Sequence, residues 1–106
     1  MSASPNSKVK HVVTVHLKSG HDLVARDSNG LSDPYVKMKM GLVDGYSKVK
    51  SAIMYKTLSP IWNETFTMAV QNIEDPLLIR VYDKDFMTDD FMGRHILHLT
   101  SLPLNK

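Results

Sequence analysis

The chain has 106 residues and a net charge of +2, and its composition, 42% hydrophobic and 23% charged, is that of one globular domain with a modest core. It contains no cysteine, which excludes disulfide and thiol chemistry and favours a cytoplasmic location. No apolar run approaches the roughly 20 residues of a membrane span and no signal-peptide core begins the chain, so any membrane association is expected to be peripheral.

The chain alternates between short strand-like runs and turns. A Ser-, Pro- and Asn-rich tail at residues 1–8 is expected to be disordered and precedes a single domain over residues 9–106. Alternation of apolar and polar residues is the period of a half-buried strand. We expect strands at residues 9–17, 35–40, 46–55, 61–70, 77–81 and 94–99.

The apolar side of each alternation supplies a candidate core. No stretch shows sustained helical periodicity, and about six short strands with regularly spaced turns predict an all-β antiparallel sandwich. The residues expected to point inward are Val13, Val15, Leu17, Val36, Met38, Met40, Trp62, Phe66, Met68, Val70, Leu77, Ile79 and Val81.

The strand at residues 77–81 leads into a loop that is unusually rich in carboxylates, with Asp83, Asp85, Asp89 and Asp90. At a separation of ~4 Å and an effective dielectric of ~20, two like charges repel by about 4 kcal/mol. A cation is therefore expected among them, and oxygen ligands without interleaved Cys or His indicate calcium or magnesium. Four large apolar residues, Phe86, Met87, Phe91 and Met92, are expected on the same turn.

A second loop, at residues 25–34, is dense in turn formers and carries Asp27 and Asp33. Each acidic loop follows a strand, so a sandwich can bring both loops to the same end. Calcium takes about six to eight oxygen ligands at roughly 2.3–2.6 Å. Five carboxylates from the two loops, with backbone carbonyls, could therefore hold more than one ion.

Four motifs, in this order, resemble those of the C2 domain family and together cover roughly residues 9–99. They are Asp27-x-x-Gly30-x-Ser32-Asp33-Pro34-Tyr35-Val36-Lys37, Lys56-Thr57-Leu58-Ser59-Pro60-Ile61-Trp62-Asn63-Glu64-x-Phe66, Val81-Tyr82-Asp83-x-Asp85 and Asp90-Phe91-Met92-Gly93. The spacing within the acidic loop is most similar to that in the multiple-C2-domain transmembrane proteins. The resemblance implies a C2-type sandwich that binds Ca²⁺ and then an anionic phospholipid membrane, in signalling or membrane trafficking, and that is not an enzyme.

The resemblance also implies roles for individual residues. The metal ligands would be Asp27, Asp33, Asp83, Asp85 and Asp90, with help from the carbonyls of Arg26 and Lys84. Leu31, Phe86 and Met87 would insert into the membrane, the alternative being that they pack over the loops. Asp89 is left either as a support for the ligands or as a solvated residue.

The basic residues support a second hypothesis. Lys37, Lys39, Lys48 and Lys50 match the lysine cluster with which lipid-binding members of the family meet phosphoinositide headgroups, although Ala52 stands where some members have another Lys. Each Lys near an anionic surface contributes about 1 kcal/mol. The alternative function is therefore a calcium-independent phosphoinositide or protein–protein interaction module. A plain solvated lysine face is the other interpretation.

A complete C2 domain would have about eight strands, against about six here, so the resemblance implies an incomplete sandwich that lacks its C-terminal strands. Exposed core and unpaired edges would then favour self-association through strand edges or poor stability. Nothing indicates an enzyme, because there is no Gly-rich phosphate loop and no nucleophile elbow. Nucleic-acid binding is not expected, because aromatic residues do not interleave with the basic ones.

Overall fold

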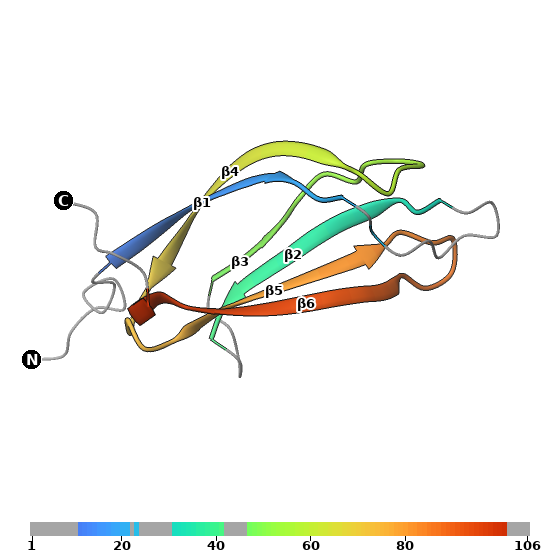
Figure 1. The fold of residues 1–106 in the computed structure, drawn as a ribbon. Coiled ribbons are helices and arrows are strands. Elements are labelled where there is room, and N and C mark those ends of the chain that lie inside the picture. Colours follow the sequence, from blue (N-terminus) through green and yellow to red (C-terminus); the bar gives the residue numbers. More distant parts are fainter. Residues whose placement is uncertain (1–10, 22, 24–30, 42–46, 102–106) are drawn as a thin grey trace, which may run out of the picture.

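The computed structural model describes residues 11–21, 23, 31–41 and 47–101, and this part of the chain is built of β-strands (Figure 1). The elements in chain order are β1 (His11–Ser19), β2 (Pro34–Met40), β3 (Ser47–Lys50), β4 (Ile61–Val70), β5 (Pro76–Asp83), β6 (Asp90–His98) and the 3₁₀ turn η2 (Leu99–Ser101). All strand pairs are antiparallel. The prediction of an all-β antiparallel fold is confirmed. The predicted tail at residues 1–8 lies outside the described residues.

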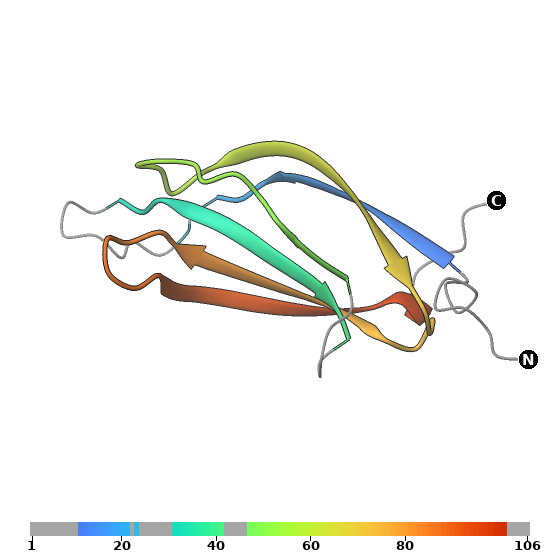
Figure 2. The ribbon, with the colours of Figure 1, turned by 180° about the vertical axis from the view of Figure 1, so that it is seen from behind.

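The strands form two sheets that face each other. One contains β1 and β4, and the other has the order β3-β2-β5-β6. Seen from either side, the β1–β4 ribbon lies over the four-stranded sheet (Figures 1 and 2). The segment that follows β3 and the loop between β5 and β6 reach the same end of the molecule (Figure 1). That end is called the acidic end below, because it carries Asp33, Asp83 and Asp90.

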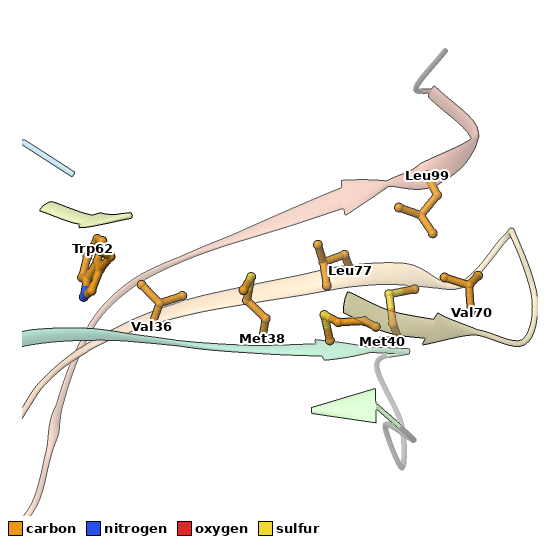
Figure 3. Packing of buried hydrophobic residues seen from close by; sticks show 8 residues of the cluster. Val36, Met38, Met40, Trp62, Val70, Leu77 and Leu99 are labelled. Carbon is orange, nitrogen blue, oxygen red and sulfur yellow. The ribbon is translucent and has the colours of Figure 1, made fainter. Parts of the chain in front are cut away.

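The core lies between the sheets and consists mainly of the side chains that the alternation predicts. The buried members of this cluster are Val36, Met38, Met40, Trp62, Met68, Val70, Leu77 and Leu99. They follow the length of β2 and β5, from Trp62 at one end to Val70 and Leu99 at the other (Figure 3). Burying each such side chain contributes about 1.5–3 kcal/mol relative to leaving it in water.

Several predicted core residues are only half-buried against this cluster. They are Val13, Val15, Leu17, Phe66, Ile79 and Val81. For β1 the cause is visible in the topology, because among the described strands β1 pairs with β4 alone. The inward side chains of β1 therefore have a neighbouring strand on one flank only, within the described residues.

The predicted strand at residues 46–55 is wrong at its C-terminal half, because regular pairing ends at Lys50. The hydroxyl of Ser51 accepts the N–H of Val36 at 2.8 Å and so takes the place of a backbone carbonyl in the ladder. The same hydroxyl donates to the carbonyl of Ala52, which also accepts the indole N–H of Trp62. Side-chain hydrogen bonds of this kind compete with the ladder and turn the chain towards β4.

The last predicted strand begins too late, since β6 starts at Asp90 rather than at residue 94. Asp90 pairs with Asp83 and Phe91 with Tyr82, whereas Gly93 pairs with Val81. Met92 is the extra residue of the resulting β-bulge. Phe91 and Met92 therefore lie on a strand and not on the turn that the sequence predicts for them.

Candidate functional site

Three of the five predicted aspartates meet where β2 begins, β5 ends and β6 begins. Asp33 directly precedes β2, and Asp83 pairs with Pro34 on one side and Asp90 on the other. The N–H of Asp33 donates to Oδ1 of Asp83 at 2.8 Å, and its carbonyl accepts the N–H of Lys84 at 2.9 Å. The Asp83 side chain is 0% exposed and that of Asp90 is half-buried.

The segment between β3 and β4 is hydrogen-bonded to the residues that precede β2 at the acidic end. The N–H of Lys56 donates to Oδ1 of Asp33 at 2.6 Å, and that of Thr57 donates to the carbonyl of Ser32 at 2.8 Å. Lys56 has φ 56°, a left-handed conformation that costs a non-glycine residue roughly 1–2 kcal/mol. The hydrogen bond from the Lys56 N–H to the Asp33 carboxylate stabilises this conformation and ties the β3–β4 segment to the start of β2. No sequence pattern indicates this role of Lys56.

The loop between β5 and β6 is organised around Asp89. Its Oδ1 accepts the N–H of Asp85 at 3.1 Å and lies 3.7 Å from the ammonium of Lys84. Its Oδ2 accepts the hydroxyl of Tyr35, a residue of β2. Asp89 therefore ties the loop to β2, which decides between the two roles left open for it in favour of structural support.

The electrostatics of the Tyr35–Asp89 pair follow from these contacts. Burial raises the pKa of Tyr35, which is only 3% exposed, and the hydrogen bond to Asp89 and its negative charge raise it further. The Tyr35 hydroxyl, then the Asp85 N–H and, more weakly, the charges of Lys84 and Lys37 lower the pKa of the Asp89 carboxyl. The tyrosine thus keeps its proton as a donor and the aspartate remains an ionised acceptor.

The structure gives less information on the remaining predicted ligands. Asp85 is exposed, and its Oδ1 accepts the N–H of Phe86 at 2.6 Å. Asp27 and Arg26 lie outside the described residues. Within the part of the chain that the structure describes, no three His, Cys, Asp or Glu side chains are close enough together to hold a metal ion.

The donor chemistry at the acidic end nevertheless fits a hard cation. Asp33 and Asp83 are joined by a hydrogen bond, Asp83 and Asp90 are cross-strand partners, and each of the three residues offers carboxylate oxygen. Carboxylate and carbonyl oxygens are the ligands of Ca²⁺ and Mg²⁺. In a site of this kind, the three residues would supply carboxylate oxygen from three segments of chain, and the site itself stays a prediction.

Two large apolar side chains project from the loop that carries Asp85. Phe86 is 94% exposed and Met87 is 85% exposed, so neither packs over the loop. Leu31, the third residue predicted to insert, is half-buried. An acidic end with exposed apolar side chains beside it can combine cation binding with insertion into an apolar phase.

The four predicted lysines come together in an open groove on the outer face of the four-stranded sheet. Lys37 pairs with Lys50, and Lys39 pairs with Lys48. The groove has a volume of about 420 Å³, and Arg80 also lines it. Sequence reasoning missed Arg80 and Tyr82, although the alternation that points Ile79 and Val81 inward places both on the outer face.

Tyr82 lines the end of this basic groove nearest the acidic end, and Tyr35 packs against it. The rings of Tyr35 and Tyr82 are stacked, with centroids 5.8 Å apart and an interplanar angle of 24°. The ammonium of Lys37 lies 4.9 Å from the centroid of Tyr82, and that of Lys50 lies 5.9 Å from the centroid of Tyr35. Such cation–π contacts are worth about 0.5–1 kcal/mol at exposed sites and fix where the positive charges lie.

Comparison with known proteins agrees with this fold. A model of the C2 domain family matches residues 11–106. The chain is 48% identical over 93 residues to the multiple C2 and transmembrane domain-containing protein of Drosophila melanogaster, covering 87% of this chain and 10% of that protein. It is 42% identical over 100 residues to multiple C2 and transmembrane domain-containing protein 2 of Mus musculus, covering 94% of this chain and 11% of that protein. The chain thus spans about a tenth of the length of these relatives.

Solved structures are similar as well. A calcium-bound structure of two C2 domains of extended synaptotagmin 2 superposes with a TM-score of 0.75 at 30% identity, covering 85% of this chain and 35% of that one. No helix in the described residues is both long and apolar enough to cross a membrane. The family match over nearly the whole chain and the two-sheet architecture lead to one conclusion: the chain belongs to the C2 domain family.

Proposed function

We propose that this chain is a non-catalytic, calcium-dependent phospholipid-binding module that acts at the cytoplasmic face of membranes. The observation that carries the proposal is the meeting of Asp33, Asp83 and Asp90 at one end of the sandwich, beside the exposed Phe86 and Met87. Further support comes from the similar extended synaptotagmin 2 structure, which is described as calcium-bound.

In this proposal the ion is held by the carboxylates of two loops. The five ligands would be Asp27, Asp33, Asp83, Asp85 and Asp90, with the carbonyls of Arg26 and Lys84. Bound calcium supplies positive charge that bridges protein carboxylates and lipid phosphates. In its absence the acidic end repels an anionic surface, so calcium binding changes the sign of the local field without requiring a large conformational change.

The apolar and basic residues would complete membrane binding. Phe86 and Met87 would enter the interface from the β5–β6 loop, with Leu31 contributing from the first acidic loop. The basic groove would add attraction of about 1 kcal/mol for each Lys or Arg that approaches the anionic surface. In this proposal the membrane would meet the cation and the apolar loop tip at the acidic end, and the basic groove along the outer face of the four-stranded sheet.

Co-sedimentation with vesicles that contain phosphatidylserine tests this function. The wild-type chain is expected to pellet with the vesicles in micromolar to millimolar calcium and to stay in solution in chelator. Asp85→Asn should abolish calcium-dependent pelleting, as should Asp83→Asn combined with Asp85→Asn. Glu74→Gln removes the same charge from an exposed residue in the β4–β5 turn and should bind like the wild type. Equal binding in calcium and in chelator would reject the proposal.

The basic groove supports one alternative, a calcium-independent module that binds phosphoinositides or a protein. The specific observation is that Lys37, Lys50 and Arg80 line a concave surface of about 420 Å³. Under this alternative, inositol polyphosphate would bind equally with and without calcium, and calcium alone would give neither heat nor a thermal shift. Both results together would favour the alternative over the calcium-dependent module.

We also propose that strand edges support self-association. Among the described strands β1 has one partner, β4, and Val12 on β1 is 63% exposed. An edge that offers free backbone groups and apolar side chains is a template for pairing with another chain. Sedimentation velocity should show dimers or larger species whose fraction rises with concentration. A monodisperse monomer that melts cooperatively would contradict this proposal.

A further inference from the structure

We propose that Tyr35 and Asp89 form a positioning pair that holds the β5–β6 loop from β2 and links the cation site to the basic groove. The inference rests on the proposed function for its consequence, but the contacts themselves do not depend on it. Neither residue is a proposed metal ligand or membrane anchor. Their hydrogen bond joins residues 54 positions apart in the sequence.

The loop side of the pair is a carboxylate with both oxygens engaged. Oδ2 of Asp89 accepts the Tyr35 hydroxyl, while Oδ1 accepts the N–H of Asp85 and faces the ammonium of Lys84. Asp89 is thus turned towards the protein, and it fixes the backbone of Asp85, a proposed ligand. Because both the donor and the acceptor of the Asp85–Asp89 bond lie in the loop, the Tyr35 hydroxyl anchors their arrangement to β2.

The groove side of the pair is an aromatic stack. Tyr35 is 3% exposed, so its ring has little freedom to move once its hydroxyl is bound. The ring stacks on Tyr82, and the ammonium groups of Lys37 and Lys50 lie over the two rings. Any shift of the Tyr35 ring therefore moves the surface against which the groove lysines are held.

These two sides predict reciprocal coupling between the sites. A cation bound by Asp85 orders the loop and strengthens the Tyr35–Asp89 bond, which fixes the aromatic stack and the lysines above it. An anionic phosphate in the groove then meets lysines that are already ordered, and by linkage it raises the affinity for the cation by the same factor. Coupling of this kind is typically about fivefold or more.

Amide hydrogen exchange of the metal-free chain tests the positioning role directly. Tyr35→Phe removes only the hydroxyl, and the amide of Asp85 should then exchange about tenfold faster, because the carboxylate that protects it is no longer anchored. Tyr55→Phe makes the same chemical change at an exposed tyrosine and serves as the control. Unchanged exchange at Asp85 in Tyr35→Phe, in a variant that retains the wild-type melting temperature, would overturn the inference.

Two variants of Asp89 separate a positioning role from a general loss of stability. Asp89→Asn keeps an acceptor oxygen for the Tyr35 hydroxyl, so it should retain part of the protection that Asp89→Ala loses. Both variants remove the ion pair with Lys84, which is exposed and expected to be weak. Equal exchange at Asp85 in the two variants would contradict the role assigned to the hydrogen bond.

Calorimetric titration tests the coupling. Calcium is titrated into the chain with and without inositol 1,4,5-trisphosphate as a soluble phosphate probe. The wild-type affinity for calcium should rise about fivefold or more with the probe, and this factor should fall to about one in Tyr35→Phe. A variant that keeps the wild-type factor would overturn the coupling. If the wild type binds neither calcium nor the probe, the proposed function fails and the coupling with it, whereas the exchange experiment still decides the positioning role.

Discussion

The N–H of Asp33 donates a hydrogen bond to Oδ1 of Asp83 across 50 positions of sequence, at a distance of 2.8 Å. This bond joins the residue that precedes β2 to the end of β5 and so places Asp33 next to Asp83. Asp83 is fully buried, and burying a carboxylate is costly unless it accepts hydrogen bonds. The N–H of Asp33 supplies one such bond. The contact between Asp33 and Asp83 therefore forms without a bound cation.

Two substitutions of Asp83 should separate the contribution of this hydrogen bond to stability from the contribution of the negative charge. Asp83→Asn keeps an acceptor oxygen for the Asp33 N–H, whereas Asp83→Ala leaves that donor unsatisfied at a cost of about 1–3 kcal/mol. In metal-free denaturant unfolding, Asp83→Ala should therefore be less stable than Asp83→Asn by about that amount. Equal free energies of unfolding for the two variants would show that the bond contributes nothing.

The Ser51 hydroxyl should be a determinant of stability although it lies outside any strand. It accepts the buried N–H of Val36, so Ser51→Ala should lower the free energy of unfolding by about 1–3 kcal/mol. Ser59→Ala, at an exposed residue of the same segment, is the matched control and should change stability by less than about 0.5 kcal/mol. Similar effects of the two substitutions in chemical denaturation would contradict this assignment.

The strand pattern was largely predictable from the sequence, because alternation reports directly which residues face the core. Val36, Met38 and Met40 are buried as predicted. What alternation could not report is how the strands end. The hydroxyl of Ser51 interrupts the ladder after Lys50, and the bulge at Met92 lets pairing extend back to Asp90; both depend on contacts between distant segments.

The candidate site shows the same division. Strand pairing places the backbone of Asp83 opposite that of Asp90, and Asp33 adjoins Pro34 at the start of β2. That the carboxylates of Asp33, Asp83 and Asp90 act together as metal ligands stays a prediction, because no three such side chains of the described residues are close enough to hold an ion. The sequence left the role of Asp89 open between support for the ligands and solvation, because that role depends on Tyr35, whose hydroxyl no local pattern directs towards that loop. The contribution of Arg80 to the basic groove follows from alternation along β5, but only once the neighbours of β5 are known.

The exposed tip of the β5–β6 loop should govern membrane affinity without governing calcium affinity. Phe86→Ser and Met87→Ser each remove an apolar side chain that touches little of the protein, so stability should stay within about 0.5 kcal/mol of the wild type. Vesicle binding in calcium should weaken by about tenfold or more for each, since burying a Phe or Met contributes about 1.5–3 kcal/mol. Vesicle affinities equal to that of the wild type would mean that the loop tip does not insert.

The basic groove should set how strongly membrane binding depends on salt. Lys37→Ala with Lys50→Ala removes two charges held over the Tyr35–Tyr82 stack, so binding to anionic vesicles should weaken and become less sensitive to ionic strength. Lys18→Ala removes one such charge from β1, outside the groove, and is the comparison for Lys37→Ala alone. Equal salt dependence of these two single variants would contradict a special contribution of the groove to binding.

The central claim is that calcium and an anionic membrane bind to the acidic end together, and calcium titration by calorimetry in the presence and absence of phosphatidylserine vesicles tests it most directly. We predict saturable calcium binding to the chain alone, with an affinity about tenfold or more higher when the vesicles are present. Binding heat that is absent up to millimolar calcium under both conditions, with vesicles bound equally well in chelator, would contradict the account.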